Sequence, residues 1–342
     1  MSPRPGAGRS ALVRAASAVG VATALAAAAP VGAAAGVAGA TAVRPRVRAA
    51  ADASAGADAG VGADVNALVV RERPGSGVAR YWTAARMAAA TSEDAGGKGV
   101  PARPAPQTAA GAAAAAARMP SAYLNGRPSI GVLFFRGRDL KSHFCTAFVV
   151  SGRTRNLLMM AAHCRPGSSQ AFVPGYRIRG TTAAPYGIWP VLRSFTDRRF
   201  RTSGSGTDFD YAFAKVGRNA AGRQIEDVTH GNTLTRTPAY ANRRVGVTGY
   251  PRASAAAPNR PITCWAPTRR LGRRRQLVFL CNGYYGGTSG SPWLIDYRAR
   301  TNTGRVIGLI GGVGGGGPNA WTSYSPVFDG NTLALYRYAL AH

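Results

Sequence analysis

The sequence predicts an all-β fold, and three observations support that prediction. Short apolar runs recur between Gly, Pro, Asn and Ser breaks from residue 130 onward, with a spacing typical of an antiparallel barrel or sandwich. Almost all Tyr, Phe and Trp residues lie beyond residue 123, so the apolar core belongs to the C-terminal two thirds of the chain. The first 120 residues are dominated by Ala, Gly and Pro, which form cores poorly.

The predicted strands share an apolar composition and a length of about four to seven residues. They lie at residues 130–135, 145–150, 157–162, 211–216, 244–250, 276–281, 293–296 and 305–310. The C-terminal segment differs, because Leu333, Tyr336 and Leu340 recur at a spacing close to that of a helix. Asn331 can cap this helix. The sequence therefore predicts a β body followed by a short C-terminal helix.

The N-terminal region indicates export. Arg4, Arg9 and Arg14 give a positively charged start, and residues 15–35 form an Ala/Val stretch with small residues suited to cleavage. Because alanine is only weakly hydrophobic, we expect a removed signal peptide over residues 1–40 and no stable membrane insertion. Residues 41–120 are expected to be an Ala/Gly/Pro-rich propeptide or linker, largely disordered, with a more ordered island near residues 65–87. Residues 121–342 are the predicted folded domain, in a secreted, extracellular protein.

Three residues beside the predicted strands form a candidate catalytic triad. Ser289 lies in the glycine-crowded turn Gly-Gly-Thr-Ser-Gly-Ser-Pro-Trp, where its hydroxyl could act as a nucleophile if a base activates it. His163 ends an apolar run of strand length, and Asp210 directly precedes another. A histidine can take the serine proton while a carboxylate orients its ring. Asp208 is the close rival of Asp210 for that role. Of the other histidines, His143 is expected to be a buried structural residue.

The order His163, Asp210, Ser289 resembles that of the chymotrypsin-like (trypsin-fold) serine peptidases. Within them it is most similar to the bacterial secreted branch that includes the V8-type glutamyl endopeptidases. Further matching segments are His143-Phe144-Cys145, Ala161-Ala162-His163-Cys164 and Gly249-Tyr250-Pro251. The resemblance covers about residue 123 to the C-terminus.

The resemblance implies two packed six-stranded antiparallel β-barrels with a short C-terminal helix. Barrel one, at about residues 128–220, would carry His163 and Asp210, and barrel two, at about 235–330, would carry Ser289. The implied function is a secreted serine endopeptidase that hydrolyses polypeptides through an acyl-enzyme intermediate. The backbone N–H groups of Gly287 and Ser289 would form the oxyanion hole, since glycine leaves room for this donor pair. No cofactor is implied, and we expect a monomer.

The four cysteines lie in the predicted domain and fit two disulfides in an oxidising compartment. The resemblance implies a Cys145–Cys164 bond, which leaves Cys264 and Cys281 as the second pair. A metal site on His143, Cys145, His163 and Cys164 is the alternative. The usual Cys-x-x-Cys spacing of zinc sites is missing, so we expect no metal.

Two departures from the family pattern concern activation and specificity. Thr288 stands before the nucleophile, where animal trypsin-type enzymes have an aspartate that pairs with a new N-terminus. Gly283 replaces the carboxylate of the trypsin pocket, and Ile310 stands where the glutamyl enzymes have histidine. We expect an apolar or neutral specificity pocket, lined by Gly283, Tyr284, Leu309, Ile310 and Gly311.

The chain is strongly basic, with a net charge of +29. From residue 121 onward it has 30 Lys and Arg against 8 Asp and Glu. Such a surface favours electrostatic association with anionic cell-wall polymers. An arginine cluster at residues 269–275 lies between two cysteines and lacks interleaved aromatics, so we expect no specific nucleic-acid binding. The alternative function is a catalytically silent trypsin-fold protein that binds anionic cell-surface polymers.

Overall fold

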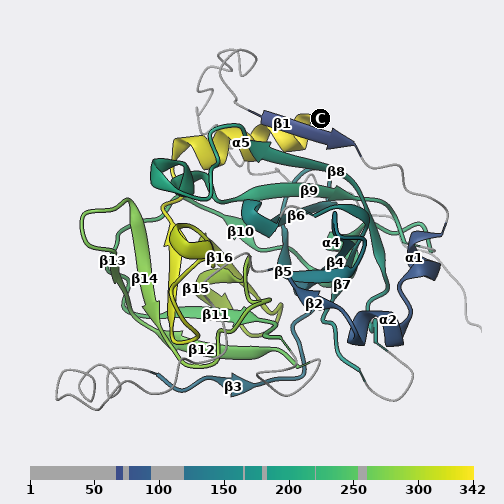
Figure 1. Cartoon of the computed structure of the whole chain (residues 1–342), viewed down its shortest axis with the longest axis horizontal. Coiled ribbons are helices and arrows are strands. Elements are labelled where there is room, and N and C mark those ends of the chain that lie inside the picture. Colours follow the sequence, from purple (N-terminus) through teal and green to yellow (C-terminus); the bar gives the residue numbers. More distant parts are fainter. Residues whose placement is uncertain are drawn as a thin grey trace, which may run out of the picture. The chain divides into compact units, whose positions relative to one another are not determined.

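Six antiparallel strands of the first half close into a barrel, here called barrel one (Figure 1). They are β4 (Ile130–Arg136), β5 (Ser142–Val150), β6 (Leu157–Met160), β7 (Ser168–Pro174), β8 (Trp189–Asp197) and β9 (Ala212–Val216). Their order is β8-β7-β4-β5-β6-β9, and pairing of β8 with β9 closes the ring. The structure is a computed structural model that describes residues 67–71, 77–93, 119–164, 166–178, 183–219, 221–252 and 260–342.

Strand β4 shows why the strands of barrel one read as continuous apolar runs. Successive side chains of a strand point to opposite faces. Val132 and Phe134 belong to one buried cluster, whereas Leu133 and Phe135 belong to another. Both faces of β4 are therefore buried, so the sequence of this strand does not alternate between apolar and polar residues.

The second half, here called barrel two, consists of two sheets. A six-stranded sheet has the order β10-β16-β15-β11-β12-β3, and a three-stranded sheet has the order β13-β14-β17. The strands are β3 (Ala122–Tyr123), β10 (Thr233–Leu234), β11 (Val245–Gly249), β12 (Ile262–Ala266), β13 (Thr268–Arg270), β14 (Gln276–Leu280), β15 (Pro292–Arg298), β16 (Thr303–Leu309) and β17 (Thr322–Pro326). Pro267 separates β12 from β13, and because proline has no N–H the ladder changes sheets there.

The C-terminal helix α5 (Gly330–Ala341) begins two residues earlier than the sequence predicts. Asp329, and not Asn331, is the N-cap: its carboxylate accepts the backbone N–H groups of Asn331 and Thr332, and the Thr332 hydroxyl accepts the N–H of Asp329. This reciprocal capping box satisfies donors that a helix start otherwise leaves unpaired. The helix buries Leu335 and Ala339 and contacts β8 and β9.

Part of the predicted linker packs on barrel one. It forms β1 (Ala67–Arg71), α1 (Val78–Tyr81), α2 (Ala84–Ala88) and β2 (Thr91–Ser92). Strand β1 extends the sheet at β8, and β2 pairs with β5 at His143 and Phe144. Trp82 is 1% exposed, and its Nε1 donates to the carbonyl of Ser169 at 2.7 Å. The predicted signal peptide and the rest of residues 41–120 up to Arg118 lie outside the described residues.

Both expected disulfides are present. Cys145 on β5 is bonded to Cys164, and Cys264 on β12 is bonded to Cys281 at the end of β14. The first bond ties the short 3₁₀ turn η1 (Ala162–Cys164) to the wall of barrel one, and the second joins the two sheets of barrel two. In the described parts of the chain, no helix has the length and apolarity needed to cross a membrane.

Candidate active site

His163 lies in η1, directly after β6 leaves the sheet. Its neighbour Cys164 is bonded to Cys145, so the turn is held against β5. Only 7% of His163 is exposed. The apolar run before it is therefore the buried strand that the sequence predicts, and the polar residue follows where that strand ends.

Asp210 lies between the 3₁₀ helix η2 (Gly204–Phe209) and β9, and its carboxylate is buried. Oδ2 is 2.7 Å from Nδ1 of His163, while Oδ1 accepts the backbone N–H of His163 at 2.8 Å. Oδ2 also accepts the backbone N–H of Gly312 at 2.6 Å. Because a carboxylate can only accept here, the proton of the imidazole is assigned to Nδ1, which leaves Nε2 as the basic nitrogen.

Asp208 has a different partner. Its Oδ1 accepts a hydrogen bond from Nε2 of Gln276 at 2.8 Å. Of the two carboxylates that the sequence offers at this position, Asp210 is the one bonded to the ring of His163.

The loop that carries Ser289 is fastened to barrel one. The N–H of Thr146 on β5 donates to the carbonyls of both Gly287 and Ser289 at 3.0 Å, and the Thr146 hydroxyl donates to Gly287 at 2.9 Å. A Cβ on Gly290 would lie 2.2 Å from the carbonyl of Thr146 and 3.1 Å from the nitrogen of Ala161. The nucleophile loop is thus packed against the backbone of the two strands that lead to His163.

Two peptide groups of this loop have fixed orientations. The carbonyl of Gly286 accepts the N–H of Arg252 at 2.7 Å, and the carbonyl of Thr288 accepts the Ser291 hydroxyl at 2.6 Å. In a trans peptide the N–H points opposite to the C=O. The N–H of Gly287 is therefore directed away from Arg252, and that of Ser289 away from Ser291.

Gly287 occupies a position that only glycine fits. Its φ is +90°, and a Cβ would lie 2.4 Å from the ring of Phe144 and 2.7 Å from the carbonyl of Tyr250. Side chains rarely adopt this backbone region, and here space is lacking as well. This close contact between Gly287 and Phe144 sets the separation between the nucleophile loop and β5.

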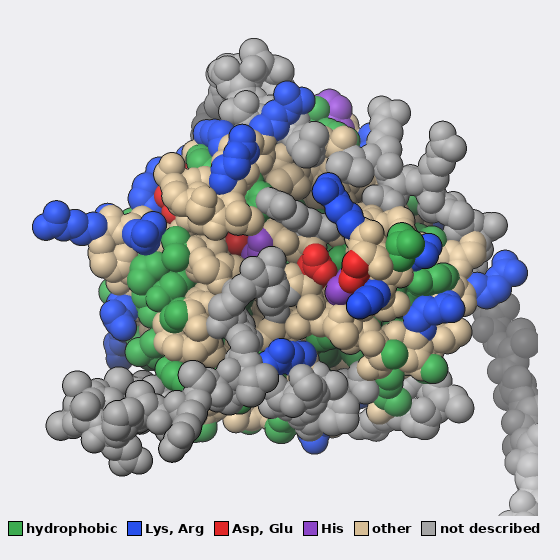
Figure 2. Space-filling model, viewed as in Figure 1, with side chains coloured by type: hydrophobic (Ala, Val, Ile, Leu, Met, Phe, Trp, Pro, Cys, Tyr) green, Lys and Arg blue, Asp and Glu red, His purple; other side chains and the backbone are tan. Residues whose placement is uncertain are grey.

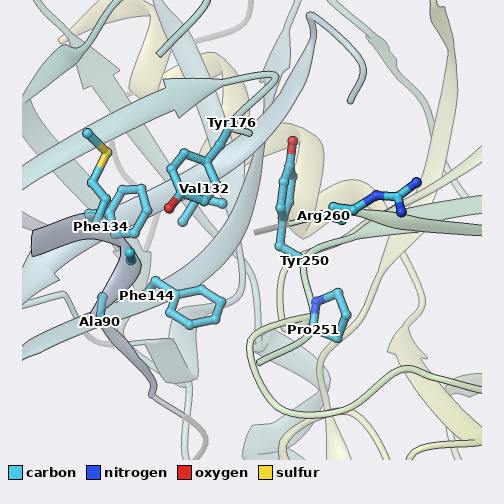
Figure 3. A pocket seen from close by; sticks show the side chains of 10 residues that line it. Ala90, Val132, Phe134, Phe144, Tyr176, Tyr250, Pro251 and Arg260 are labelled. Carbon is cyan, nitrogen blue, oxygen red and sulfur yellow. The ribbon is translucent and has the colours of Figure 1, made fainter. Parts of the chain in front are cut away.

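Phe144 also lines a small aromatic cavity (Figure 3). Phe134, Phe144, Tyr176 and Tyr250 surround it, and Met87 and Ala90 of the N-terminal segment complete the wall. Burial raises the pKa of the Tyr250 hydroxyl far above its usual value, so this group stays neutral. The N-terminal segment therefore packs on the same aromatic residues that support the nucleophile loop.

The expected specificity residues have contrasting surroundings. Tyr284, Leu309 and Ile310 are fully buried, and the hydroxyl of Tyr284 donates to the carbonyl of Val247 at 2.8 Å. Gly283 has φ +89°, and a Cβ there would meet Ser121. Beyond Gly311 the backbone has positive φ at Gly312, Gly314, Gly315, Gly316 and Gly317. The pocket assignment stays a prediction.

His143 lies beside β2 and between two carboxylates. Nδ1 is 3.2 Å from Oε2 of Glu93 and 3.1 Å from Oγ1 of Thr91, and Nε2 is 2.9 Å from Oδ1 of Asp139. The hydrogen bond from His143 lowers the pKa of the Asp139 carboxyl. Its side chain is 13% exposed. This setting fits the structural role expected for His143.

Figure 2 shows blue Lys and Arg side chains at the left, upper and right of this face of the molecule, and few red carboxylates. The arginine cluster at residues 269–275 lies at the β13–β14 hairpin. At its end, Arg275 pairs with Asp329 at 2.8 Å.

Sequence reasoning missed three residues of this region: Thr146, Gln276 and Gly312. Thr146 is a single polar residue within an apolar run and Gln276 is the first residue of another, a pattern with no chemical signature. The backbone N–H through which Gly312 contacts Asp210 is a group that every residue except proline has. Only the folded geometry identifies them.

The arrangement of the two barrels defines the fold. The chain has the two-barrel fold of the chymotrypsin-like serine peptidases. It is similar to the crystal structure of the protease Anisep from Arthrobacter nicotinovorans, with 24% identity and a TM-score of 0.55 over 65% of this chain and 100% of that chain. It is also similar to the thermostable serine protease AL20 from an extremophilic microorganism, with 20% identity and a TM-score of 0.51 over 63% of this chain and 97% of that chain. No protein-family model and no curated protein matches the chain.

Proposed function

We propose that this protein is a secreted serine endopeptidase with Ser289 as nucleophile, His163 as general base and Asp210 as orienting acid. The observation that carries the proposal is the hydrogen bond of 2.7 Å between His163 and Asp210, next to a nucleophile loop packed on the same strands. A buried carboxylate that fixes the tautomer of a histidine is the arrangement that base-assisted attack by serine requires.

The first half of the reaction acylates the enzyme. Oγ of Ser289 attacks the carbonyl carbon of the scissile peptide bond while Nε2 of His163 takes the hydroxyl proton. The tetrahedral intermediate collapses, the C–N bond breaks, and the imidazolium gives its proton to the leaving amine. Asp210 keeps the ring oriented and stabilises its positive charge throughout.

The second half releases the acid. A water molecule gives a proton to Nε2 of His163 and attacks the acyl carbon. Collapse of the second intermediate breaks the bond to Oγ, and the proton returns to Ser289. No cofactor takes part.

The N–H groups of Gly287 and Ser289 are the proposed oxyanion donors. Their orientation is supported by the carbonyl partners of Gly286 and Thr288, which direct both N–H groups away from the loop anchors. Donors that are fixed before reaction stabilise the developing charge without reorganisation, and removing one typically costs about 100- to 1000-fold in kcat.

The substrate is a polypeptide, and we propose an apolar or neutral residue at the specificity pocket. Export fits the paired state of all four described cysteines, because disulfides persist in oxidising compartments. Binding of anionic polymers to the basic surface remains a separate expectation.

The test is covalent labelling of the secreted protein with a sulfonyl fluoride, followed by peptide mapping. We expect one adduct, on Ser289, together with cleavage of a diverse peptide mixture. Ser289→Ala should abolish both. Ser129→Ala is the control for the adduct, because Ser129 is equally buried and its hydroxyl donates to the carbonyl of Asn302, outside the nucleophile loop.

Labelling elsewhere, or none on folded protein, would contradict the endopeptidase. If the wild type is also inert toward peptides but binds anionic cell-wall polymers in a salt-sensitive way, the binding protein is the better description.

A further inference from the structure

Gln276, the first residue of β14, is a fully buried amide with partners on both sides. Its Nε2 donates to Oγ1 of Thr207 at 3.0 Å and to Oδ1 of Asp208 at 2.8 Å. Its Oε1 accepts the backbone N–H of Val313 at 3.0 Å. Both donors and the acceptor of the amide are used, as a buried amide requires.

The partners of Gln276 flank Asp210 in the chain and in space. Thr207 and Asp208 belong to η2, which leads directly into Asp210, and the N–H of Asp210 donates to the carbonyl of Thr207. Val313 follows Gly312, whose N–H donates to Oδ2 of Asp210 at 2.6 Å. One side chain therefore joins the segment that carries Asp210 to the segment that donates to it.

The donor segment needs such support because it consists largely of glycine. Residues 311–317 have a single side chain beyond hydrogen, that of Val313. Glycine has the greatest backbone freedom of any residue, so this loop is ordered only by bonds to its backbone and by close contacts. At Gly312 a Cβ would lie 2.5 Å from Oε1 of Gln276. The amide thus packs directly on the residue that donates to Asp210.

We propose that Gln276 is a positioning residue for Asp210, and through Asp210 for His163. From β14 of barrel two, Gln276 holds the N–H of Gly312 on Oδ2 of Asp210. Its bonds to Thr207 and Asp208 also fix η2, which belongs to barrel one. The same contact fixes the start of the glycine loop. Its effect on turnover rests on the proposed function, whereas its effect on hydrogen bonding at Asp210 does not.

Three substitutions separate the elements of this role. Gln276→Met keeps length and apolar volume but removes both donors and the acceptor. Gln276→Glu keeps an acceptor for Val313 but replaces the donor with an oxygen that faces Asp208. Asn232→Leu is the matched control: Asn232 is another fully buried amide, its Nδ2 donates to the carbonyl of Val149 at 3.1 Å, and its Oδ1 accepts the N–H of Gly304 at 3.0 Å, so these partners lie outside η2 and residues 311–317.

The first experiment needs no catalysis. In full-length Ser289→Ala protein, amide hydrogen exchange of Gly312 and the proton resonance of His163 Nδ1–H are measured by NMR. With Gln276→Met we expect Gly312 to exchange at least about tenfold faster, and the Nδ1–H resonance to move. Asn232→Leu should leave both unchanged even if it lowers overall stability. Unchanged exchange and an unchanged resonance in folded Gln276→Met protein would overturn the proposal.

The second experiment measures turnover with Ser289 intact. A displacement of about 1 Å in a catalytic group can cost about 100-fold. We expect kcat to fall by this order in Gln276→Met and Gln276→Glu, with a smaller change in KM, because Asp210 acts mainly in the transition state. If Gln276→Met does not fold, Gln276→Glu and its NMR data decide.

The two hypotheses fail separately. A wild type that is inert toward sulfonyl fluorides and peptides removes the endopeptidase but leaves the Gly312 result standing. A wild type that is active, with kcat and Gly312 exchange both unaffected in the Gln276 variants, removes only the positioning role.

Discussion

Asp210 holds His163 at two points: Oδ2 faces Nδ1 of the ring at 2.7 Å, and Oδ1 accepts the backbone N–H of the same residue at 2.8 Å. A single bond would leave the ring free to swing about the carboxylate. Two bonds fix both the backbone and the imidazole of His163 relative to one buried group.

Replacing this carboxylate with an amide should remove activity but keep the fold. In Asp210→Asn the side-chain NH2 can face Nδ1, which favours the wrong tautomer of His163. By analogy with other triads we expect kcat to fall about 10⁴-fold. The measurement is peptide hydrolysis beside urea unfolding of the same protein. A variant that keeps more than a tenth of wild-type kcat would show that Asp210 is not the orienting acid.

The packing of the nucleophile loop on barrel one predicts an unequal cost for two glycine substitutions. Gly290→Ala combines φ +85° with a Cβ that lies 2.2 Å from the carbonyl of Thr146. Gly272→Ala, the control, has φ +51° but meets nothing within 4 Å. Positive φ costs about 1–2 kcal/mol for a side chain. We expect Gly272→Ala to cost about that much and Gly290→Ala at least about 2 kcal/mol more.

Urea unfolding midpoints measure this difference. Equal costs for the two variants would show that Gly290 has more room than the geometry gives it, and that the loop is not packed against β5.

The N-terminal segment should contribute strongly to stability. Trp82 is 1% exposed, and its ring centroid lies 5.3 Å from that of Phe134. Its Nε1 donates a hydrogen bond to the carbonyl of Ser169. We expect Trp82→Ala to lower the free energy of unfolding by about 3–5 kcal/mol, in the range of large core truncations. Tyr123→Ala, at a 44% exposed aromatic, should change it by about 0.5 kcal/mol or less. Similar small effects at both positions would mean that residues 77–93 are dispensable for the fold.

The start of α5 should make stability depend on pH. Burial would raise the pKa of the Asp329 carboxyl, but hydrogen bonds from Asn331, Arg275 and Thr332 outweigh it and lower the pKa. A lowered folded-state pKa means that the stabilisation is present above the ordinary carboxyl pKa and is lost as pH falls through the lowered value.

Asp329→Asn isolates the charge, since asparagine also caps helices. We expect it to cost about 0.5–1 kcal/mol at neutral pH, the order of a partly exposed ion pair. The difference from wild type should vanish toward acidic pH in urea unfolding. Asp296→Asn is the control, because the Asp296 side chain is 62% exposed beside Arg305. A constant difference across pH would contradict the role of the Asp329 charge.

Each strand that the sequence predicted is one whose burial leaves an apolar run. β4, β5, β6 and β9 of barrel one, and β11, β14, β15 and β16 of barrel two, lie where such runs occur. β17, with the sequence TSYSP, was not predicted, because its order comes from the ladder with β14 and not from its own hydrophobicity. The cap of α5 was assigned to Asn331 because its side chain suits that role, but Asp329 forms a reciprocal pair with Thr332.

The same distinction applies to the candidate site: some of it could be predicted from residue types, and the rest depends on which segments meet in the fold. Ser289, His163 and Asp210 were predicted because each has a chemical identity and a strand or turn beside it. The structure adds that Asp210 is the carboxylate bonded to His163 and that Asp208 binds Gln276. Contacts made by backbone groups, such as the N–H of Gly312 on Asp210, depend on which chain segments meet across the two barrels. Residue identity does not encode them locally.

The bond from Gly312 to Asp210 has a consequence for biosynthesis. Barrel one is translated before residues 286–317, and chains fold from the N-terminus as they emerge. A nascent chain with only barrel one formed has His163 and Asp210 in place but neither Ser289 nor the Gly312 donor. Under the proposed mechanism such a chain cannot hydrolyse anything near it, so the order of synthesis itself delays the chemistry until the whole domain has assembled.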